Sequence, residues 1–143
     1  MSQRTVRQII EGHQPVTASA NTTVQEAARL MKEHNIGALM VCEGDQLAGV
    51  FTERDALFRV LAAGVAGDTP VSAVMTANPR TIAPECPFSA ALHVMHEGHF
   101  RHLPVVEEGR VIGVVSVRDA LGPELESFVY EMLRQEQIQE VLA

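Results

Sequence analysis

Apolar side chains in the segment 22–35 recur at helical spacing. Those expected on one helical face are Val24, Ala27, Ala28, Leu30 and Met31. This spacing is typical of an amphipathic helix packed on a core. Thr22 or Thr23 can cap its start. The segment therefore predicts a helix, preceded by a short extended stretch at 15–19.

A second segment repeats this order further along the chain. An extended stretch is expected at 79–83, and Pro87 takes the matching first-turn position of the helix that follows. Gly98 is expected to end that helix. The sequence therefore predicts the same pair of elements twice.

Each predicted helix is followed by two apolar runs with turn residues between them. The turns fall at Gly44-Asp45 and at Glu108-Gly109, and this pattern is typical of a β-hairpin. A further helix is predicted after each hairpin, and the first of these ends at Gly64. The order of elements in each half is therefore β-α-β-β-α.

The two halves are copies of one unit. Residues 14–57 align with residues 78–121 without a gap, at an offset of 64, with fourteen identities in forty-four positions. Six of nine letters agree between "GVFTERDAL" and "GVVSVRDAL". We expect repeats over 5–65 and 66–122 that pack about a pseudo-twofold axis, because neither would bury enough apolar surface alone.

The last segment has no counterpart in the repeat. Its apolar residues follow an i, i+3, i+4, i+7, i+8 pattern at Leu125, Phe128, Val129, Met132 and Leu133. This predicts an amphipathic helix over 123–143. Its apolar face must be covered by the body of the protein or by another subunit, so we expect it to serve packing or a homodimer.

Composition narrows the classes of function. The 143 residues include 46% hydrophobic and 20% charged residues, which is ordinary for a globular protein. The net charge of −7 argues against a nucleic-acid partner, which requires a basic face. No membrane span and no signal peptide are expected. Cys42 and Cys86 stand alone and fit free thiols in the cytoplasm.

The pattern hydroxyl-x-Arg-Asp, at 52–55 and again at 116–119, allows two interpretations. It is a capping box that a helix uses without any ligand. It also suits a nucleotide, because a helix start favours an anion and a carboxylate accepts hydrogen bonds from two sugar hydroxyls. Arg54 and Arg118 are unfavourable in a first helical turn, so their repetition indicates a negatively charged partner.

With this motif in both copies, the chain resembles the family of CBS-domain pairs, also called Bateman modules. The resemblance covers about residues 5–121 and includes "NIGALMVCEGDQLAGVFTERD" and "HFRHLPVVEEGRVIGVVSVRD". It implies an α/β (α+β) fold of two β-α-β-β-α repeats that stands alone. We expect a regulatory module that binds AMP, ADP or ATP between the repeats, with NAD(H) or S-adenosylmethionine as further candidates.

The resemblance also implies which residues contact the ligand. Asp55 and Asp119 would hold ribose hydroxyls, with Thr52 and Ser116 near phosphate. The base would occupy a slot built by the first extended segment and the start of each hairpin. The slot residues are Thr17, Ala18, Ser19, Ile36, Gly37 and Ala38 in copy one, and Thr81, Ile82, Ala83, Phe100, Arg101, His102, Leu103 and Pro104 in copy two. Because Arg101 and His102 offer two phosphate partners, we expect the second site, or a phosphate path shared across the axis, to bind anions more readily.

Other functions stay open. The chain could be a ligand-free interaction module whose capping boxes are only structural. Histidines recur every third residue from His93 to His102, but Gly98 should end the helix before His99, and no cysteine or carboxylate cluster completes a metal site. Nucleophile-elbow, Walker A and dinucleotide-binding glycine motifs are missing from the sequence, so we expect neither an enzyme nor a catalytic cofactor.

Overall fold

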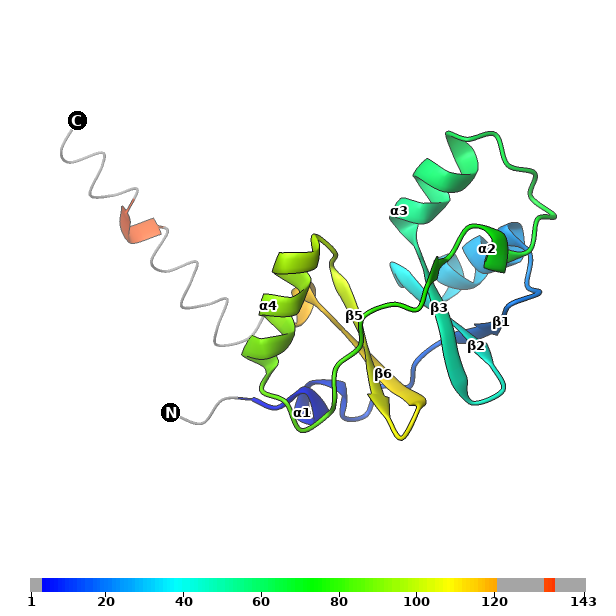
Figure 1. Cartoon of the computed structure of the whole chain (residues 1–143). Helices are drawn as coiled ribbons and strands as arrows, with labels where there is room; N and C mark the ends of the chain where they lie inside the picture. Colours follow the sequence, from blue (N-terminus) through cyan, green and yellow to red (C-terminus); the bar gives the residue numbers. More distant parts are fainter. Residues whose placement is uncertain (1–3, 121–132, 136–143) are drawn as a thin grey trace, which may run out of the picture.

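The computed structural model describes residues 4–120 and 133–135 (Figure 1). The elements of the first half are β1 (Thr17–Ser19), α2 (Val24–His34), β2 (Ala38–Glu43), β3 (Gln46–Thr52), α3 (Glu53–Asp55) and η1 (Ala56–Leu61). Those of the second half are α4 (Phe88–Gly98), β5 (His102–Glu107), β6 (Arg110–Ser116) and η3 (Val117–Ala120). A short helix, α1 (Val6–Ile10), precedes the first half. The linker between the halves contains η2 (Val71–Ala73) and β4 (Thr76–Ala77). The helix predicted over 123–143 lies outside the described residues, apart from 133–135, which are helical.

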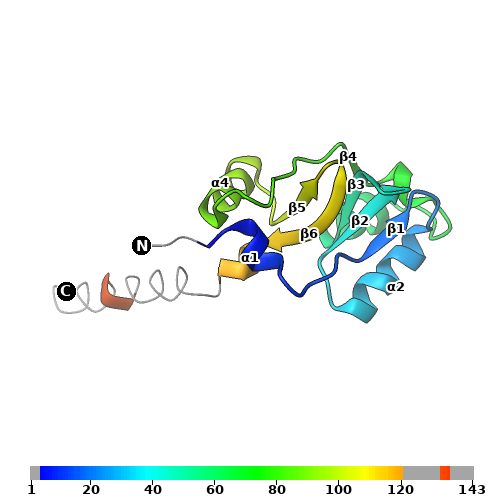
Figure 2. The ribbon, with the colours of Figure 1, turned by 90° about the horizontal axis from the view of Figure 1, so that it is seen from below.

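The strands form one mixed sheet in the order β1-β2-β3-β6-β5, and β4 also pairs with β3, at Gly49 and Val50 (Figure 2). Both hairpins are antiparallel, and each carries a register shift at an equivalent place, after Val41 and after Val105. These positions are 64 residues apart, which is the offset of the sequence repeat. The two hairpins meet at the single pair Gln46–Arg110. The predicted arrangement of two packed β-α-β-β-α repeats is therefore confirmed.

The start of α2 and the end of α4 lie where the sequence predicted them, and the start of α4 differs by the place of Pro87. Thr23 caps α2, with its hydroxyl accepting from the backbone N–H of Glu26. Pro87 stands at the N-cap of α4 rather than in the first turn. Gly98 is the last residue of α4, as predicted, and the C-cap residue His99 takes the left-handed conformation, with a φ of +58°. Gly98 is needed for a different reason from the expected one, since a side chain there would overlap the ring of Phe100.

The helix predicted after the first hairpin is only partly α-helical. It continues beyond Asp55 as the π-helix η1, where the N–H of Ala62 donates to the carbonyl of Leu57 at 2.8 Å. The sequence contains no signal for this wider turn. Its apolar side chains Leu57, Phe58 and Leu61 are 51%, 53% and 74% exposed, so this helix leaves an uncovered apolar strip.

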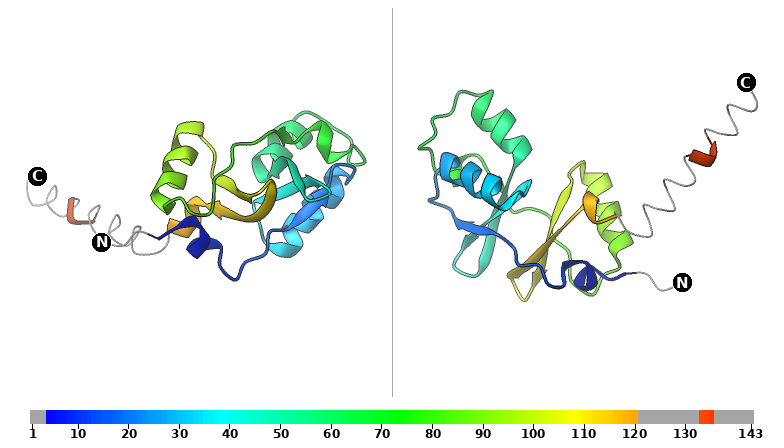
Figure 3. Two further views of the ribbon diagram at one scale, coloured as in Figure 1. Left: turned by 60° about the horizontal axis from the view of Figure 1, so that its bottom comes forward. Right: turned by 180° about the vertical axis from the view of Figure 1, so that it is seen from behind.

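The segment before each repeat packs on the other repeat. Helix α1 lies against the second half, where the N–H of Val6 donates to the carbonyl of Cys86 at 2.8 Å (Figure 3). The linker makes the equivalent contact with the first half, where the N–H of Val71 donates to the carbonyl of Thr22 at 2.7 Å. Cys86 and Thr22 are 64 residues apart. The exchange of segments therefore ties the two repeats together.

Two glycines of the repeated motif make room for these exchanged segments. A side-chain carbon on Gly49 would lie 2.5 Å from the sulfur of Met75 and 2.8 Å from the carbonyl oxygen of Thr76. One on Gly113 would lie 2.8 Å from side-chain atoms of Ile10. The glycine that opens "GVFTERDAL" and "GVVSVRDAL" is thus required by close packing of a neighbouring segment.

The buried side chains form one apolar cluster per repeat and a third between them. The cluster of the first repeat includes Phe51 and Val71, and that of the second includes Phe88 and Val6, so both contain residues from an exchanged segment. The buried residues of the third cluster are Ala38, Met40 and Val50, with Val111 and Val114 of the second repeat packed against them. This third cluster holds the halves in the orientation that forms the clefts described next.

Candidate functional site

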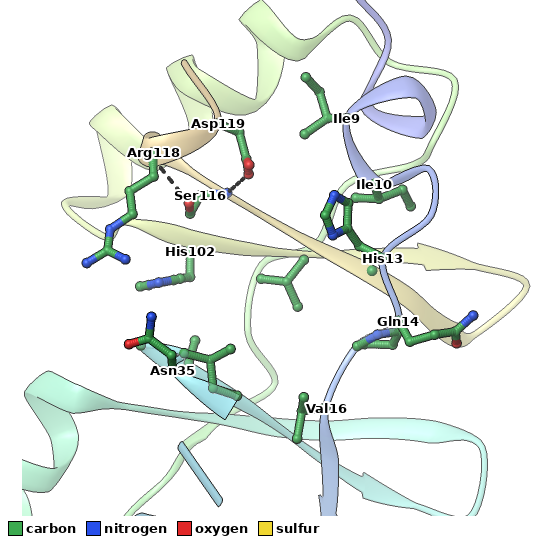
Figure 4. A pocket seen from close by; sticks show the side chains of 16 residues that line it. Ile9, Ile10, His13, Gln14, Val16, Asn35, His102, Ser116, Arg118 and Asp119 are labelled. Atoms are coloured by element: carbon green, nitrogen blue, oxygen red, sulfur yellow. Dashed lines mark hydrogen bonds between the residues drawn. The ribbon is translucent and has the colours of Figure 1, made fainter. Parts of the chain in front are cut away.

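The first cleft, here called the Asp119 cleft, has a volume of about 260 Å³ and joins the two repeats (Figure 4). The end of β6 and η3 supply Ser116, Arg118 and Asp119 from the second repeat. The opposite wall comes from the first repeat and the chain before it, and its residues include Ile9, Ile10, His13, Gln14, Val16, Asn35, Ile36, Gly37 and Ala38. The acidic motif of one copy therefore faces the predicted base slot of the other copy.

The second cleft, the Asp55 cleft, has the reverse composition and a volume of about 540 Å³. The first repeat supplies Thr52, Arg54 and Asp55. The second repeat and the linker supply Asn78, Pro79, Arg80, Phe100, His102 and Pro104. The volume falls within the usual range for small-molecule sites. This crossed composition follows from the pseudo-twofold packing and could not be derived from either repeat alone.

Asp55 is fully engaged by the protein. Its Oδ2 accepts from the N–H of Thr52 at 3.0 Å, and its own N–H donates to Thr52 Oγ1 at 3.1 Å. Its Oδ1 lies 3.5 Å from Nε of Arg59. With 7% of its surface exposed, Asp55 is the charged residue in the buried core of the described chain. The capping interpretation is thus correct for the first copy, and the same carboxylate borders the cleft.

Asp119 has a more open arrangement. Its Oδ2 accepts from the N–H of Ser116 at 2.7 Å, and Ser116 Oγ accepts from the N–H of Arg118 at 3.2 Å. Among residues 4–120 and 133–135, no side chain forms a hydrogen bond or ion pair with Oδ1 of Asp119. Figure 4 shows this carboxylate at the edge of the pocket. It can accept further hydrogen bonds without giving up those it makes.

His102 lies between the two clefts and lines both of them. A side-chain carbon on Gly37 would stand 3.1 Å from Cε1 and from Nε2 of the His102 ring, and 3.2 Å from Oε1 of Glu53. The ring therefore occupies space that Gly37 leaves free. Burial is the main influence that lowers the pKa of His102 below the ordinary value for histidine. This burial favours the neutral form of the ring.

An apolar and basic hollow adjoins the Asp55 cleft and shares Arg54, Phe58 and His102 with it. It is lined by Leu57 and Phe58 of η1 and by Phe100 and Arg101 of the second repeat. The guanidinium of Arg54 stacks over the ring of Phe58, 5.1 Å from its centroid. A flat aromatic group or an anion in the Asp55 cleft would lie beside this hollow.

Several predicted slot residues lie beside the clefts rather than in their walls. Thr17 and Ser19 are exposed on β1, and Thr81 and Ala83 are exposed on the equivalent segment. None of these four lines either cleft, and Leu103 is buried in the core of the second repeat. Their contact with a ligand stays a prediction. The cleft walls are instead lined by the residues just before these segments, 14–16 in the Asp119 cleft and 78–80 in the Asp55 cleft.

The contribution of helix α1 to the Asp119 cleft was not expected. Ile9, Ile10 and His13 line it because α1 packs on the second repeat. A search of the repeat could not find them, since the aligned part of the first copy begins at residue 14. The sequence signal for these residues is the likeness of "VRQII" at 6–10 to "VSAVM" at 71–75, which indicates that the two segments are equivalent.

A metal site and a membrane span are the two other features on which the described residues bear. Over 4–120 and 133–135, no three side chains of His, Cys, Asp or Glu converge as metal ligands. No helix in that part of the chain is long and apolar enough to cross a membrane.

Comparison with known sequences gives a consistent family. A model described as "CBS domain" matches twice, over residues 6–62 and 71–123. The chain is 41% identical over 106 residues to the CBS domain-containing protein YhcV of Bacillus subtilis, covering 74% of this chain and 76% of that one. It is also 37% identical over 114 residues to an inosine-5'-monophosphate dehydrogenase of Korarchaeum cryptofilum, covering 79% of this chain but only 23% of that enzyme.

Solved structures show the same arrangement. The CBS domain structure NE2398 superposes with a TM-score of 0.78 at 30% identity, covering 84% of this chain and 96% of that one. The CBS domain pair of protein MJ0100 superposes with a TM-score of 0.74 at 29% identity, covering 81% and 95%. The latter was solved in complex with 5'-methylthioadenosine and S-adenosyl-L-methionine.

Proposed function

The chain belongs to the CBS domain family and carries two such domains, and on this basis we propose that it is a regulatory module whose clefts bind an adenine nucleotide. AMP, ADP and ATP are the first candidates, followed by NAD(H) and S-adenosylmethionine. The observation that carries the proposal is the pairing, in each cleft, of one repeat's hydroxyl-x-Arg-Asp motif with the slot of the other repeat. The adenosyl ligands of the MJ0100 complex support the ligand class.

The chemistry of each cleft suits the parts of such a ligand. In the Asp119 cleft, Oδ1 of Asp119 is available to two ribose hydroxyls, and Ser116 and Arg118 stand beside it for phosphate. Val16 and Ile36 supply apolar walls for the base. We propose that this cleft binds first, since Oδ1 of Asp55 in the other cleft already faces Arg59.

Regulation would follow from the shared nature of the clefts. A ligand that touches both repeats contributes binding free energy only to the relative orientation that closes around it, so it shifts the population toward that orientation. A partner that distinguishes the two orientations would then respond to the ligand. No catalytic step is part of this function.

Calorimetric titration with AMP, ADP, ATP, NADH and S-adenosylmethionine tests the proposal. We expect at least one of these ligands to bind, with the guanine counterpart GMP as the matched control for the base. If none of the adenosyl ligands binds at millimolar concentration, the ligand-free interaction module becomes the better account, because Asp55 and Asp119 would then serve only to hold the backbone N–H groups of Thr52 and Ser116. Turnover of ATP would indicate an enzyme instead.

We also propose that the protein is a homodimer. The exposed side chains Leu57, Phe58 and Leu61 form the apolar strip on η1, and the helix predicted over 123–143 has an apolar face to cover. Sedimentation should show a dimer, and Leu61→Lys should shift it toward monomer because a charge would be desolvated in the contact. Ser72→Lys, on exposed η2, should leave the dimer intact. A monomer with and without residues 123–143 would contradict this proposal.

A further inference from the structure

One histidine serves both clefts. Of the residues that line the Asp119 cleft and those that line the Asp55 cleft in the described chain, His102 is the one common to both sets. Its counterpart in the first repeat is Ala38, which cannot ionise. The pseudo-twofold symmetry is therefore broken at a residue that lines both clefts.

The His102 ring packs against Gly37 of the first repeat. Gly37 has no side chain, and the imidazole Cε1 and Nε2 occupy the space in front of it, 3.1 Å from where a side-chain carbon would stand. Oε1 of Glu53 reaches the same place from α3. In Figure 4 the His102 side chain lies between Arg118 and Asn35, on the inner side of the pocket. Ligands in the two clefts would therefore both lie beside this ring.

The charges facing His102 come from three elements and oppose one another. Glu53 on α3 and Asp119 on η3 favour the imidazolium, whereas Arg118 on η3 and Arg101 beside β5 disfavour it. Further ionisable groups line the clefts, namely His13 in the Asp119 cleft and Arg54, Asp55, Arg59, Arg80 and His99 in the Asp55 cleft. Burial of the ring, together with Arg118 and Arg101, lowers the pKa of His102 when no ligand is bound. An added anion would change this balance in favour of the imidazolium.

We propose that His102 is a proton-linked binding residue common to both clefts, which takes up one proton from solvent when an anionic ligand enters either of them. This inference rests on the proposed function, because it assumes that phosphate-bearing ligands bind in these clefts. The imidazolium formed at His102 then attracts a second anion in the other cleft. Charge on the ligand, rather than the base, is what His102 selects.

The test is calorimetric titration of the full chain with AMP between pH 6.5 and 8, in two buffers with different heats of ionisation. The expected result is uptake of up to one proton, and an affinity that rises by up to about tenfold for each pH unit lowered. Adenosine, which has no phosphate, should bind without proton uptake. The AMP phosphate itself protonates near pH 6 and would weaken binding at low pH, so its effect has the opposite sign.

Variants separate this role from a merely structural one. His102→Ala introduces the residue found in the first repeat, and His102→Gln keeps a polar side chain that does not titrate; both should lose the proton uptake and the rise in AMP affinity as the pH is lowered. His93→Ala, on the exposed side of α4, should keep both. If either His102 variant retains the wild-type pH dependence, or if adenosine causes the same uptake, the inference is wrong. If AMP does not bind at any pH while another of the adenosyl ligands does, this inference alone is wrong. If none of AMP, ADP, ATP, NADH and S-adenosylmethionine binds at any pH, the proposed function fails and this inference fails with it.

A readout of the ring itself completes the test. In a histidine-detected NMR titration, the pKa of His102 should rise when AMP is added and should not change with adenosine. A pKa of His102 that stays the same at saturating AMP would overturn the proposal even where the AMP affinity depends on pH.

Discussion

Replacing Gly49 with alanine should destabilise the protein by about 2–3 kcal/mol, at the upper end of the cost of overpacking. The new methyl group would lie 2.8 Å from the carbonyl oxygen of Thr76 and 2.5 Å from the sulfur of Met75. The sulfur can move, but the carbonyl belongs to β4, which pairs with β3 at this point. Relief of the overlap therefore requires the linker to leave the sheet edge.

Denaturant unfolding of Gly49→Ala measures this cost, with two glycines as controls. Gly67 is exposed, and its nearest neighbour would be 3.4 Å from the new carbon, on the side chain of Gln25; alanine there should be neutral or stabilising by about 0.4–1 kcal/mol. Gly113→Ala should cost less than Gly49→Ala, because the overlap is with the side chain of Ile10 on the short helix α1. A Gly49→Ala protein as stable as the wild type would show that the linker does not pack there as described.

The same two glycines show how far the sequence alone could go. The repeat at an offset of 64 predicted both hairpins, both amphipathic helices and the packing of two halves, since these depend on local periodicity and on a duplication visible in the letters. It did not predict that α1 packs on the second repeat, because that exchange depends on contacts between segments about eighty residues apart, such as Val6 with Cys86. The glycines stood out as repeated, but their neighbours could not be read from the sequence.

The candidate site was predictable to a similar depth. The hydroxyl, arginine and aspartate of each motif do border a cleft, and the capping box is complete in the first copy. In the second copy the Ser116 hydroxyl accepts from the N–H of Arg118 instead of that of Asp119. The sequence could not tell which slot each motif faces, since both copies have the same local structure. The packing of the two repeats places the motif of each one opposite the slot of the other. It also did not distinguish the two carboxylates, because the contact of Asp55 with Arg59 depends on the turn at the start of η1.

That difference between the carboxylates leads to the largest expected effect on binding. Asp119→Ala should lower the affinity for the tightest adenosyl ligand by about 100-fold, because two hydrogen bonds from ribose hydroxyls to a charged acceptor would be lost, worth together about 3 kcal/mol. Asp55→Ala should affect this first binding event much less. Its main effect should be on stability, since Asp55 is buried and accepts from Thr52. Calorimetry and denaturant unfolding on both variants give the two quantities separately.

The isosteric change Asp119→Asn decides between ligand binding and capping. The asparagine oxygen can still accept from the N–H of Ser116, as Oδ2 of Asp119 does at 2.7 Å, so the start of η3 should keep its stability. The negative charge is lost, and a ribose would find a weaker acceptor, so the affinity should fall by about tenfold. An unchanged affinity in Asp119→Asn, together with a loss in Asp119→Ala no larger than its loss of stability, would mean that this carboxylate serves the helix and not the sugar. The Asp119 cleft would then have to bind its ligand through Ser116, Arg118 and His102 alone. The proposal that this cleft binds before the Asp55 cleft would no longer follow from Asp119.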